Sequence, residues 1–215
     1  MSDAGLMTPS QRTALEHVAK ELHDRFKGVF GQETIMALLQ ESFDELAATA
    51  RIKDYLVVSA KKFAVQRLKA LAQSADRTST RVPAVLFLCV HNAGRSQMAL
   101  GWFDLLASGR AIAWSGGSEP GAEINRVVVA AMAEVGIDIS EEFPKPWTDE
   151  FLGAADVVVT MGCGDACPLV PGKRYEDWDL EDPTNKTLEQ IRPIRDAVKN
   201  RVEVLLSEIL PPSTP

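Results

Sequence analysis

The sequence predicts an α/β domain with a four-stranded parallel sheet flanked by helices over residues 81–215, preceded by a small three-helix bundle and linker over residues 1–80. Two observations support this division. Before residue 74 the apolar residues recur at helical spacing, whereas after residue 83 apolar runs of strand length alternate with helical segments. That alternation is typical of a parallel sheet. The polar stretch 74–80 between the two patterns indicates a linker.

The bundle is predicted from three amphipathic segments separated by short turns. The first begins at Thr8-Pro9-Ser10-Gln11, where a capping residue, a proline and a glutamine form a helix-start signal, and it continues to Phe26. The second spans 32–48 and the third spans 52–73. The third is rich in Lys and Arg, but residues 1–80 are nearly neutral, so a solvated helix face is favoured over nucleic-acid binding. The sequence leaves open whether the bundle forms a homodimer, docks a partner or only stabilises the chain.

The α/β domain is predicted from alternating strand and helix patterns. Strand-like runs cover 85–90, 111–115, 156–161 and 173–178. The dipeptide Gly116-Gly117 stands at the end of the second run. Helical patterns cover 96–107, 125–135, 147–153 and 187–209. Ligands of such sheets bind beyond the carboxyl ends of the strands, and Cys89 and Cys163 lie at two of these ends.

The strongest chemical signal is the loop Cys89-Val90-His91-Asn92-Ala93-Gly94-Arg95-Ser96, which joins the first strand to a helix. Loop amides at a helix N-terminus bind anions, and Arg95 can donate two parallel hydrogen bonds to an anion's oxygens. The same positive field favours the reactive thiolate of Cys89, to which Ser96 can donate its hydroxyl. Asn92 tolerates a left-handed backbone, and Gly94 permits close approach of a ligand. We therefore predict an oxyanion site at residues 90–96 with Cys89 as nucleophile; the alternative is a buried structural cysteine.

A second signal is the pair Cys163 and Cys167 in a glycine-containing segment after a buried strand. Three interpretations remain open. A zinc site would combine Cys89, Cys163 and Cys167 with one histidine, chosen from His17, His23 and His91. The cysteines could also be inert thiols. The third interpretation is a redox relay, in which a mobile segment brings Cys163 first to Cys89 and then to Cys167.

A third signal is Asp182-Pro183, where proline holds the preceding aspartate in an extended conformation. An aspartate held over an anion site could act as a general acid and protonate a departing oxygen. Asp-Pro is also a common turn, so this signal depends on its context.

Composition limits the function classes further. The net charge is −7, and residues 81–215 carry the excess, with 20 Asp and Glu against 12 Lys and Arg. An anion must therefore be held by local groups rather than by the overall field. No stretch is long and apolar enough to cross a bilayer, and the N-terminus lacks an export signal. These absences predict a cytoplasmic protein, in which three cysteines are thiols or redox groups rather than structural disulfides.

The three signals together resemble the arsenate reductases built on the low-molecular-weight tyrosine phosphatase fold, specifically the thioredoxin-coupled kind. The resemblance covers about residues 83–210. It rests on the loop from Cys89 to Ser96, on the pair Cys163 and Cys167, and on Asp182-Pro183. Phosphatases of this fold share the first and third signals without needing the cysteine pair. They usually follow Asp-Pro with tyrosines, where this chain has Thr184.

The resemblance implies a relay of three cysteines with no bound cofactor or metal. Cys89 would attack arsenate held by the loop and Arg95, while Asp182 protonates the departing oxygen. Cys163 would then attack Cys89 and release arsenite, and Cys167 would attack Cys163. Thioredoxin, as external reductant, would reduce the resulting Cys163–Cys167 disulfide. Phosphate and sulfate would compete with arsenate for the loop.

Two other functions remain open at this point. One is a tyrosine phosphatase in which the cysteine pair is a redox switch, and the other is an arsenical-sensing DNA-binding regulator. The chain also departs from some relatives. Only three residues separate Cys163 from Cys167, and Gln97-Met98-Ala99-Leu100 offers no carboxylate for the potassium site that some relatives have.

Overall fold

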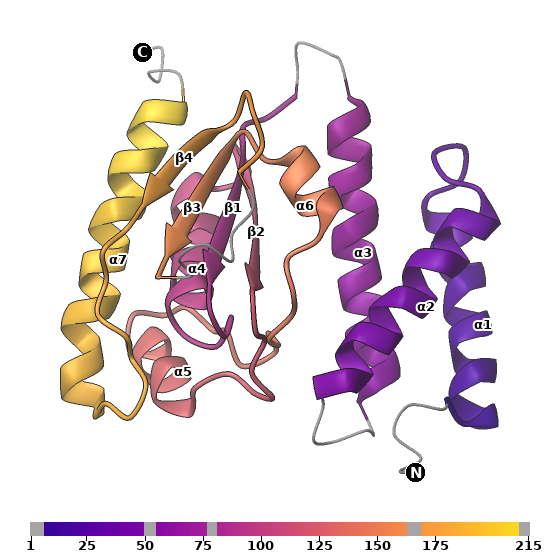
Figure 1. Cartoon of the computed structure of the whole chain (residues 1–215), viewed down its shortest axis with the longest axis horizontal. Coiled ribbons are helices and arrows are strands. Elements are labelled where there is room, and N and C mark those ends of the chain that lie inside the picture. The colour runs from indigo at the N-terminus through magenta and orange to yellow at the C-terminus, as the bar shows by residue number, and fades with distance from the viewer. Residues whose placement is uncertain (1–6, 50–54, 77–80, 163–168, 211–215) are drawn as a thin grey trace. The chain divides into compact units, whose positions relative to one another are not determined.

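A computed structural model of the chain describes residues 7–49, 55–76, 81–162 and 169–210. The chain divides into two compact units, residues 1–77 and residues 78–215 (Figure 1). Within the described ranges, no helix combines the length and apolarity needed to span a membrane.

The first unit consists of α1 (Pro9–Arg25), α2 (Gln32–Thr49) and α3 (Leu56–Ala75). The predicted start of α1 is present, because Thr8 and Gln11 exchange backbone-to-side-chain hydrogen bonds of 2.9 and 3.2 Å. The core is formed by apolar residues at the predicted helical spacing: Leu15, Leu22, Ile35, Leu39, Phe43, Leu46, Leu56, Phe63 and Leu68. The predicted start of the third helix, 52–54, lies outside the described residues. The predicted linker begins two residues too early, since α3 continues to Ala75 and the Asp76 N–H donates to Ala72 O at 3.0 Å.

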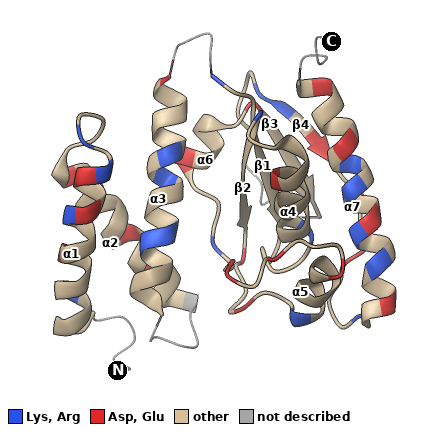
Figure 2. Cartoon of the chain, turned by 180° about the vertical axis from the view of Figure 1, so that it is seen from behind, with Lys and Arg blue, Asp and Glu red and all other residues tan. Residues whose placement is uncertain are grey.

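Basic residues of α3 make ion pairs inside the bundle. Lys61 Nζ lies 2.7 Å from a Glu21 carboxylate oxygen on α1, and Arg67 Nη2 lies 2.8 Å from Glu41 Oε2 on α2. Figure 2 shows basic residues along α3 and acidic residues on the other two helices. Arg67 is only 5% exposed, so the prediction of a fully solvated basic face is wrong at this residue. Its charge stabilises helix packing.

The second unit is built on a parallel four-stranded sheet with strand order β2-β1-β3-β4. The strands are β1 (Ala84–Cys89), β2 (Ile112–Gly117), β3 (Val157–Met161) and β4 (Arg174–Asp177). All six residues of β1 are buried, as expected for a central parallel strand covered on both faces. Cys89, the last residue of β1, therefore lies at the centre of the carboxyl edge of the sheet.

Helices cover both faces of the sheet (Figure 1). The helices are α4 (Arg95–Ala107), α5 (Arg126–Ala133), α6 (Asp149–Ala154) and α7 (Leu188–Ile209). On one face, Phe87 joins the core formed with α4, α5 and α7, and its ring centre lies 5.7 Å from that of Phe103. On the other face, Trp114 stacks on Phe151 of α6 with ring centres 5.8 Å apart. This layering confirms the predicted fold class.

β2 differs from the prediction, which ended this strand at residue 115. Gly116 and Gly117 belong to the strand and pair with Leu88 and Cys89 of β1. The reason is the close packing of other segments against both glycines. A Cβ on Gly116 would lie 2.7 Å from Trp147 main-chain atoms, and a Cβ on Gly117 would lie 2.6 Å from Val90 O. Both positions need glycine because other backbone segments pass directly over them.

Replacing Gly117 with alanine is expected to displace the loop that follows β1. The new methyl group would also lie 3.0 Å from Asn92 N, so backbone atoms must move. We expect the free energy of unfolding to fall by about 1–3 kcal/mol, with weaker binding of inorganic phosphate, measured by chemical denaturation and calorimetry. Gly121→Ala is the matched control, because its nearest contacts would be 3.6 Å away. Equal effects of the two substitutions would contradict this role of Gly117.

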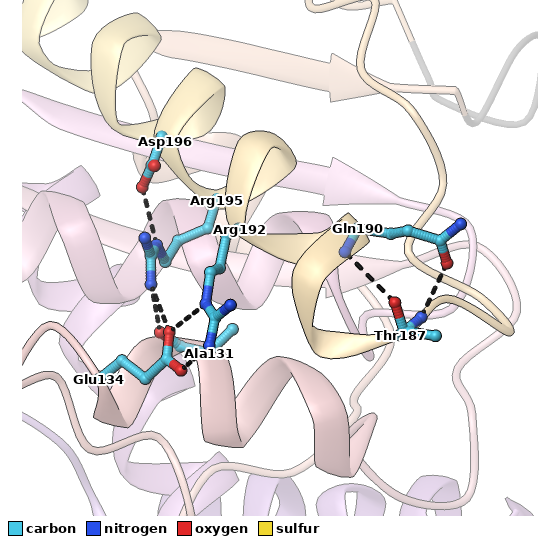
Figure 3. Close-up of polar contacts among 7 residues, drawn as sticks. All are labelled: Ala131, Glu134, Thr187, Gln190, Arg192, Arg195 and Asp196. Atoms are coloured by element: carbon cyan, nitrogen blue, oxygen red, sulfur yellow. Dashed lines mark hydrogen bonds and ion pairs between the residues drawn. The ribbon is translucent and has the colours of Figure 1, made fainter.

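α7 is held at its start and along its side (Figure 3). Thr187 caps the helix by accepting a 3.4 Å hydrogen bond from Gln190 N–H, just after the Asp-Pro segment. Further along, Arg192 and Arg195 donate to the Glu134 carboxylate beyond the end of α5, at 2.6 and 3.2 Å. These contacts hold α7 against α5 and fix the segment before α7. Residues at the start of α5 and in the segment before α7 contribute to the site described next.

Candidate active site

The loop between β1 and α4 turns tightly around the end of the central strand. Cys89 is the last residue of β1 and Arg95 is the first residue of α4. Between them, Asn92 adopts a left-handed backbone with φ of 47°, a conformation that asparagine tolerates better than most residues. The N-terminus of α4 therefore points back toward the cysteine sulfur.

Backbone carbonyls of this loop point away from its centre. The carbonyl oxygens of residues 89, 90, 91 and 93 accept hydrogen bonds of 2.8–3.3 Å from N–H groups of Ser118, Glu119, Gly121 and Asn125. In a trans peptide the N–H group points opposite to the carbonyl of the same unit. The amides that follow these carbonyls are therefore turned toward the inside of the loop. A concave set of amides at a helix N-terminus is an anion-binding structure.

The Cys89 sulfur lies at the bottom of the loop and is surrounded by donors. Cys89 is 3% exposed. Its Sγ accepts a 3.2 Å hydrogen bond from Asn92 N–H and lies 3.0 Å from Ser96 Oγ. Since Ser96 Oγ accepts a 2.8 Å hydrogen bond from Asn92 Nδ2, its own hydrogen is free to point at the sulfur. Both contacts stabilise a negatively charged sulfur, which is the nucleophilic form.

Arg95 and Asp182 form an ion pair over the loop. Arg95 Nη2 donates to Asp182 Oδ2 at 2.6 Å, and Nη1 donates to Leu180 O at 3.4 Å. The guanidinium also lies against Gly162, where an added Cβ would be 2.9 Å from Nη1. The structure thus brings together two site residues that are 87 positions apart in the sequence.

Asp182 is ionised in this arrangement. Partial burial alone would raise its pKa, and hydrogen bonds from Thr184 lower it. The positive charges of Arg95 and His91 act in the same direction, so the pKa of Asp182 lies below its ordinary value. The ion pair is therefore complete at neutral pH and is lost only as the pH falls through that lowered pKa.

A small pocket of about 40 Å³ opens above the sulfur. The predicted residues Cys89, His91, Ala93, Gly94, Arg95 and Asp182 line it, together with Asn125, Pro183 and Thr184. A volume of this size admits a few water-sized groups, which suits a tetrahedral ion with four oxygens. Val90, Asn92 and Ser96 shape the loop from behind.

Asn125 and Pro183 were not predicted to belong to the site. Asn125 caps α5 by accepting a 2.9 Å hydrogen bond from Val127 N–H, and it donates through Nδ2 to Pro183 O at 3.2 Å. Pro183 lies very close to Gly94, because a Cβ added to Gly94 would be 2.5 Å from the proline ring. In the sequence, Asn125 has only the signal of a helix cap. Nothing in the sequence indicates its second contact, with Pro183 O.

Cys163 and Cys167 lie outside the described residues. The residue before Cys163 is Gly162, which has a φ of 76° and contacts Arg95. The last described residue before the cysteine pair therefore lies beside Arg95, which lines the pocket. Of the histidines considered as zinc ligands, His91 lines the pocket, and His17 and His23 belong to α1. In the part of the chain that the structure describes, no group of three or more His, Cys, Asp or Glu side chains could hold a metal.

Two protein families match the sequence. The N-terminal domain of protein-tyrosine-phosphatase-like proteins matches residues 15–72, and the low molecular weight phosphotyrosine protein phosphatase family matches residues 84–211. The first match covers most of the helical bundle, and the second covers the sheet and the pocket.

Individual relatives are similar over the same regions. A thioredoxin-dependent arsenate reductase of Corynebacterium glutamicum has a TM-score of 0.80 at 41% identity, covering 92% of this chain and 96% of its own. A glutaredoxin arsenate reductase of Synechocystis is 40% identical over 128 residues, which are 58% of this chain and 97% of the relative. A low molecular weight protein tyrosine phosphatase of T. tengcongensis has a TM-score of 0.54 at 25% identity, covering 59% of this chain and 99% of its own.

Proposed function

The chain belongs to the low molecular weight phosphotyrosine protein phosphatase family. Within this family, we propose that it is an arsenate reductase that uses electrons from thioredoxin to reduce arsenate to arsenite. Relatives named arsenate reductase, at 36–41% identity, support this function over a phosphatase or a DNA-binding regulator. The observation that carries the proposal is the position of the Cys89 sulfur, which lies at the bottom of a small oxyanion pocket closed by Arg95 and Asp182.

The first step is attack of Cys89 on bound arsenate. The loop amides bind the arsenate oxygens, and the Arg95 guanidinium donates two parallel hydrogen bonds to them. A sulfur–arsenic bond forms while one arsenic–oxygen bond breaks. Ser96 stabilises the sulfur before attack through its hydroxyl at 3.0 Å. Phosphate and sulfate have the same tetrahedral shape and compete for this pocket.

Asp182 is the acid that protonates the departing oxygen. An arriving oxyanion takes the Arg95 hydrogen bond that now holds Asp182 at 2.6 Å. Losing this partner beside a new negative charge raises the pKa of Asp182, so the carboxylate takes up one of the two protons that dihydrogen arsenate brings, and the other proton stays on the oxygen that will leave. The proton then passes to the oxygen that leaves as water.

Replacing Asp182 with asparagine is expected to separate chemistry from binding. The turnover number should fall by about 10²- to 10⁴-fold, because asparagine cannot donate a proton to the leaving oxygen. Phosphate affinity should stay equal or increase, because Arg95 no longer binds a competing carboxylate. Steady-state kinetics with arsenate and calorimetry with phosphate measure the two effects. Weaker phosphate binding with unchanged turnover would contradict the acid role.

The later steps are thiol–disulfide exchange. Cys163 attacks Cys89, two electrons pass to arsenic, and arsenite leaves with a disulfide between the two cysteines. Cys167 then attacks Cys163, and thioredoxin reduces the Cys163–Cys167 disulfide. No bound cofactor takes part in these steps. Such a relay needs a compartment where thiols are kept reduced, which is the cytoplasm.

Reconstituted turnover tests the proposal. Purified protein is mixed with arsenate, thioredoxin, thioredoxin reductase and NADPH, and arsenate-dependent NADPH oxidation is expected. Because one relative is named a glutaredoxin arsenate reductase, a second reaction replaces thioredoxin and its reductase with glutaredoxin, glutathione and glutathione reductase. NADPH oxidation only in this second reaction would reassign the reductant. Hydrolysis of an aryl phosphate with no NADPH oxidation in either reaction would support the phosphatase alternative instead.

A further inference from the structure

Lys145 is a buried lysine with no part in the steps above. Its side chain is 0% exposed. Its Nζ lies 3.4 Å from Glu142 Oε2 and 3.4 Å from Phe143 O, and 4.8 Å from the centre of the Phe143 ring. These distances are long for a charged donor. Burial lowers the pKa of Lys145, and the Glu142 carboxylate opposes that shift only in part. A buried charge with such weak pairing contributes little to the stability of the fold.

The main chain of Lys145 is bound directly to the oxyanion loop. Its N–H donates to Asn92 Oδ1 at 3.0 Å, and its carbonyl accepts a 2.9 Å hydrogen bond from Gly117 N–H. Gly117 is the residue over which Val90 and Asn92 pass. Lys145 therefore forms the layer immediately behind the loop.

The side chain of Lys145 reaches the same asparagine through Gln97. The oxygen Phe143 O, which accepts from Lys145 Nζ, also accepts from Gln97 Nε2 at 3.3 Å. Gln97 Nε2 lies 3.1 Å from both Asn92 O and Asn92 Oδ1. Asn92 in turn donates to the sulfur of Cys89. A continuous set of hydrogen bonds thus joins the buried ammonium to the nucleophile.

An unpaired oxygen lies on Gln97, the residue that shares Phe143 O with Lys145 Nζ. Within the described residues, Gln97 Oε1 and Ser115 Oγ are buried side-chain acceptors with no hydrogen-bond partner. Ser115 is two residues before Gly117 on β2, so both face the same side of the sheet. A lysine ammonium has three N–H donors. Its positive charge makes the potential behind the loop less negative, which favours an anion in the loop.

We propose that Lys145 is a positioning residue, whose buried positive charge holds Asn92 in the conformation that binds the oxyanion. Through Asn92 it also orients the Cys89 sulfur and the Ser96 hydroxyl. This inference rests on the proposed function only in taking arsenate as the physiological oxyanion. The role requires the charge of Lys145, whereas a purely structural role requires only its volume.

Lys145→Met tests the charge, because methionine has similar length and no charge. Calorimetric titration with inorganic phosphate should show affinity about ten- to a hundredfold weaker than in the unmodified protein. The free energy of unfolding should be equal or higher, since an apolar side chain replaces a poorly paired charge. Lys145→Arg is the matched control. It keeps a positive charge at this position, so phosphate affinity should fall less than in Lys145→Met.

Lys145→Ala provides a second test by chemical rescue. Propylammonium should enter the space left by the side chain and restore phosphate affinity, whereas propanol should not. Unchanged affinity in Lys145→Met, or equal rescue by propanol, would overturn the role of the charge and leave the proposed function intact. Failure of the unmodified protein to bind phosphate would instead contradict the oxyanion pocket, and with it the proposed function.

Discussion

Replacing Cys89 with serine is expected to abolish arsenate reduction, with a loss of about 10⁴-fold or more. A serine hydroxyl stays protonated at neutral pH, and the groups around Sγ, the Asn92 N–H and the Ser96 hydroxyl, donate hydrogen bonds instead of accepting a proton. Serine also cannot form the disulfide that releases arsenite. NADPH oxidation coupled through thioredoxin measures the loss.

The same variant should keep the pocket intact. The carbonyl contacts that direct the loop amides do not involve the sulfur, and the left-handed Asn92 remains. Phosphate affinity measured by calorimetry should therefore stay close to that of the unmodified protein. Retained reductase activity in this variant would show that another residue attacks arsenate.

Replacing Arg95 with alanine is expected to reduce kcat/KM for arsenate by about 10²- to 10³-fold, the range seen when an oxyanion donor is removed. Arg95 is the charged side chain that closes the pocket, and residues 81–215 have an acidic excess that does not attract anions. Much of the loss should therefore be seen as a higher KM. Steady-state kinetics over a range of arsenate concentrations separate KM from kcat.

Arg95→Lys is the matched control for this effect. Lysine keeps the positive charge but cannot donate two parallel hydrogen bonds to two oxygens. It should therefore restore only part of the lost arsenate affinity. Full restoration by lysine would indicate that only charge matters, and an unchanged KM in Arg95→Ala would contradict direct binding of the substrate.

The oxyanion loop could be predicted because its chemistry is local. A buried strand ending at Cys89, a turn with Asn92 and Gly94, and a helix beginning at Arg95 follow one another directly. Strand and helix periodicity fix where such a segment lies at the sheet edge. Predicting the role of Asp182 required more than local sequence, because its contact with Arg95 spans 87 positions. Its role was implied by a family resemblance.

Other parts of the site could not be predicted, since they depend on contacts between distant segments. Gly116 and Gly117 follow the predicted strand 111–115, yet they belong to β2, where two backbone segments pass over them. Lys145 has no apolar pattern, and a lysine is expected at the surface. Asn125 has the signal of a helix cap and no sign of its contact with Pro183. Each becomes recognisable only when the chain is folded.

The relay of three cysteines is tested most directly by mapping the thiols after a single turnover without thioredoxin. The fully reduced protein is mixed with excess arsenate, quenched with an alkylating agent and digested for mass spectrometry. We predict one arsenite released per chain, a disulfide between Cys163 and Cys167, and an alkylated Cys89. Three alkylated cysteines with no arsenite released would contradict the relay.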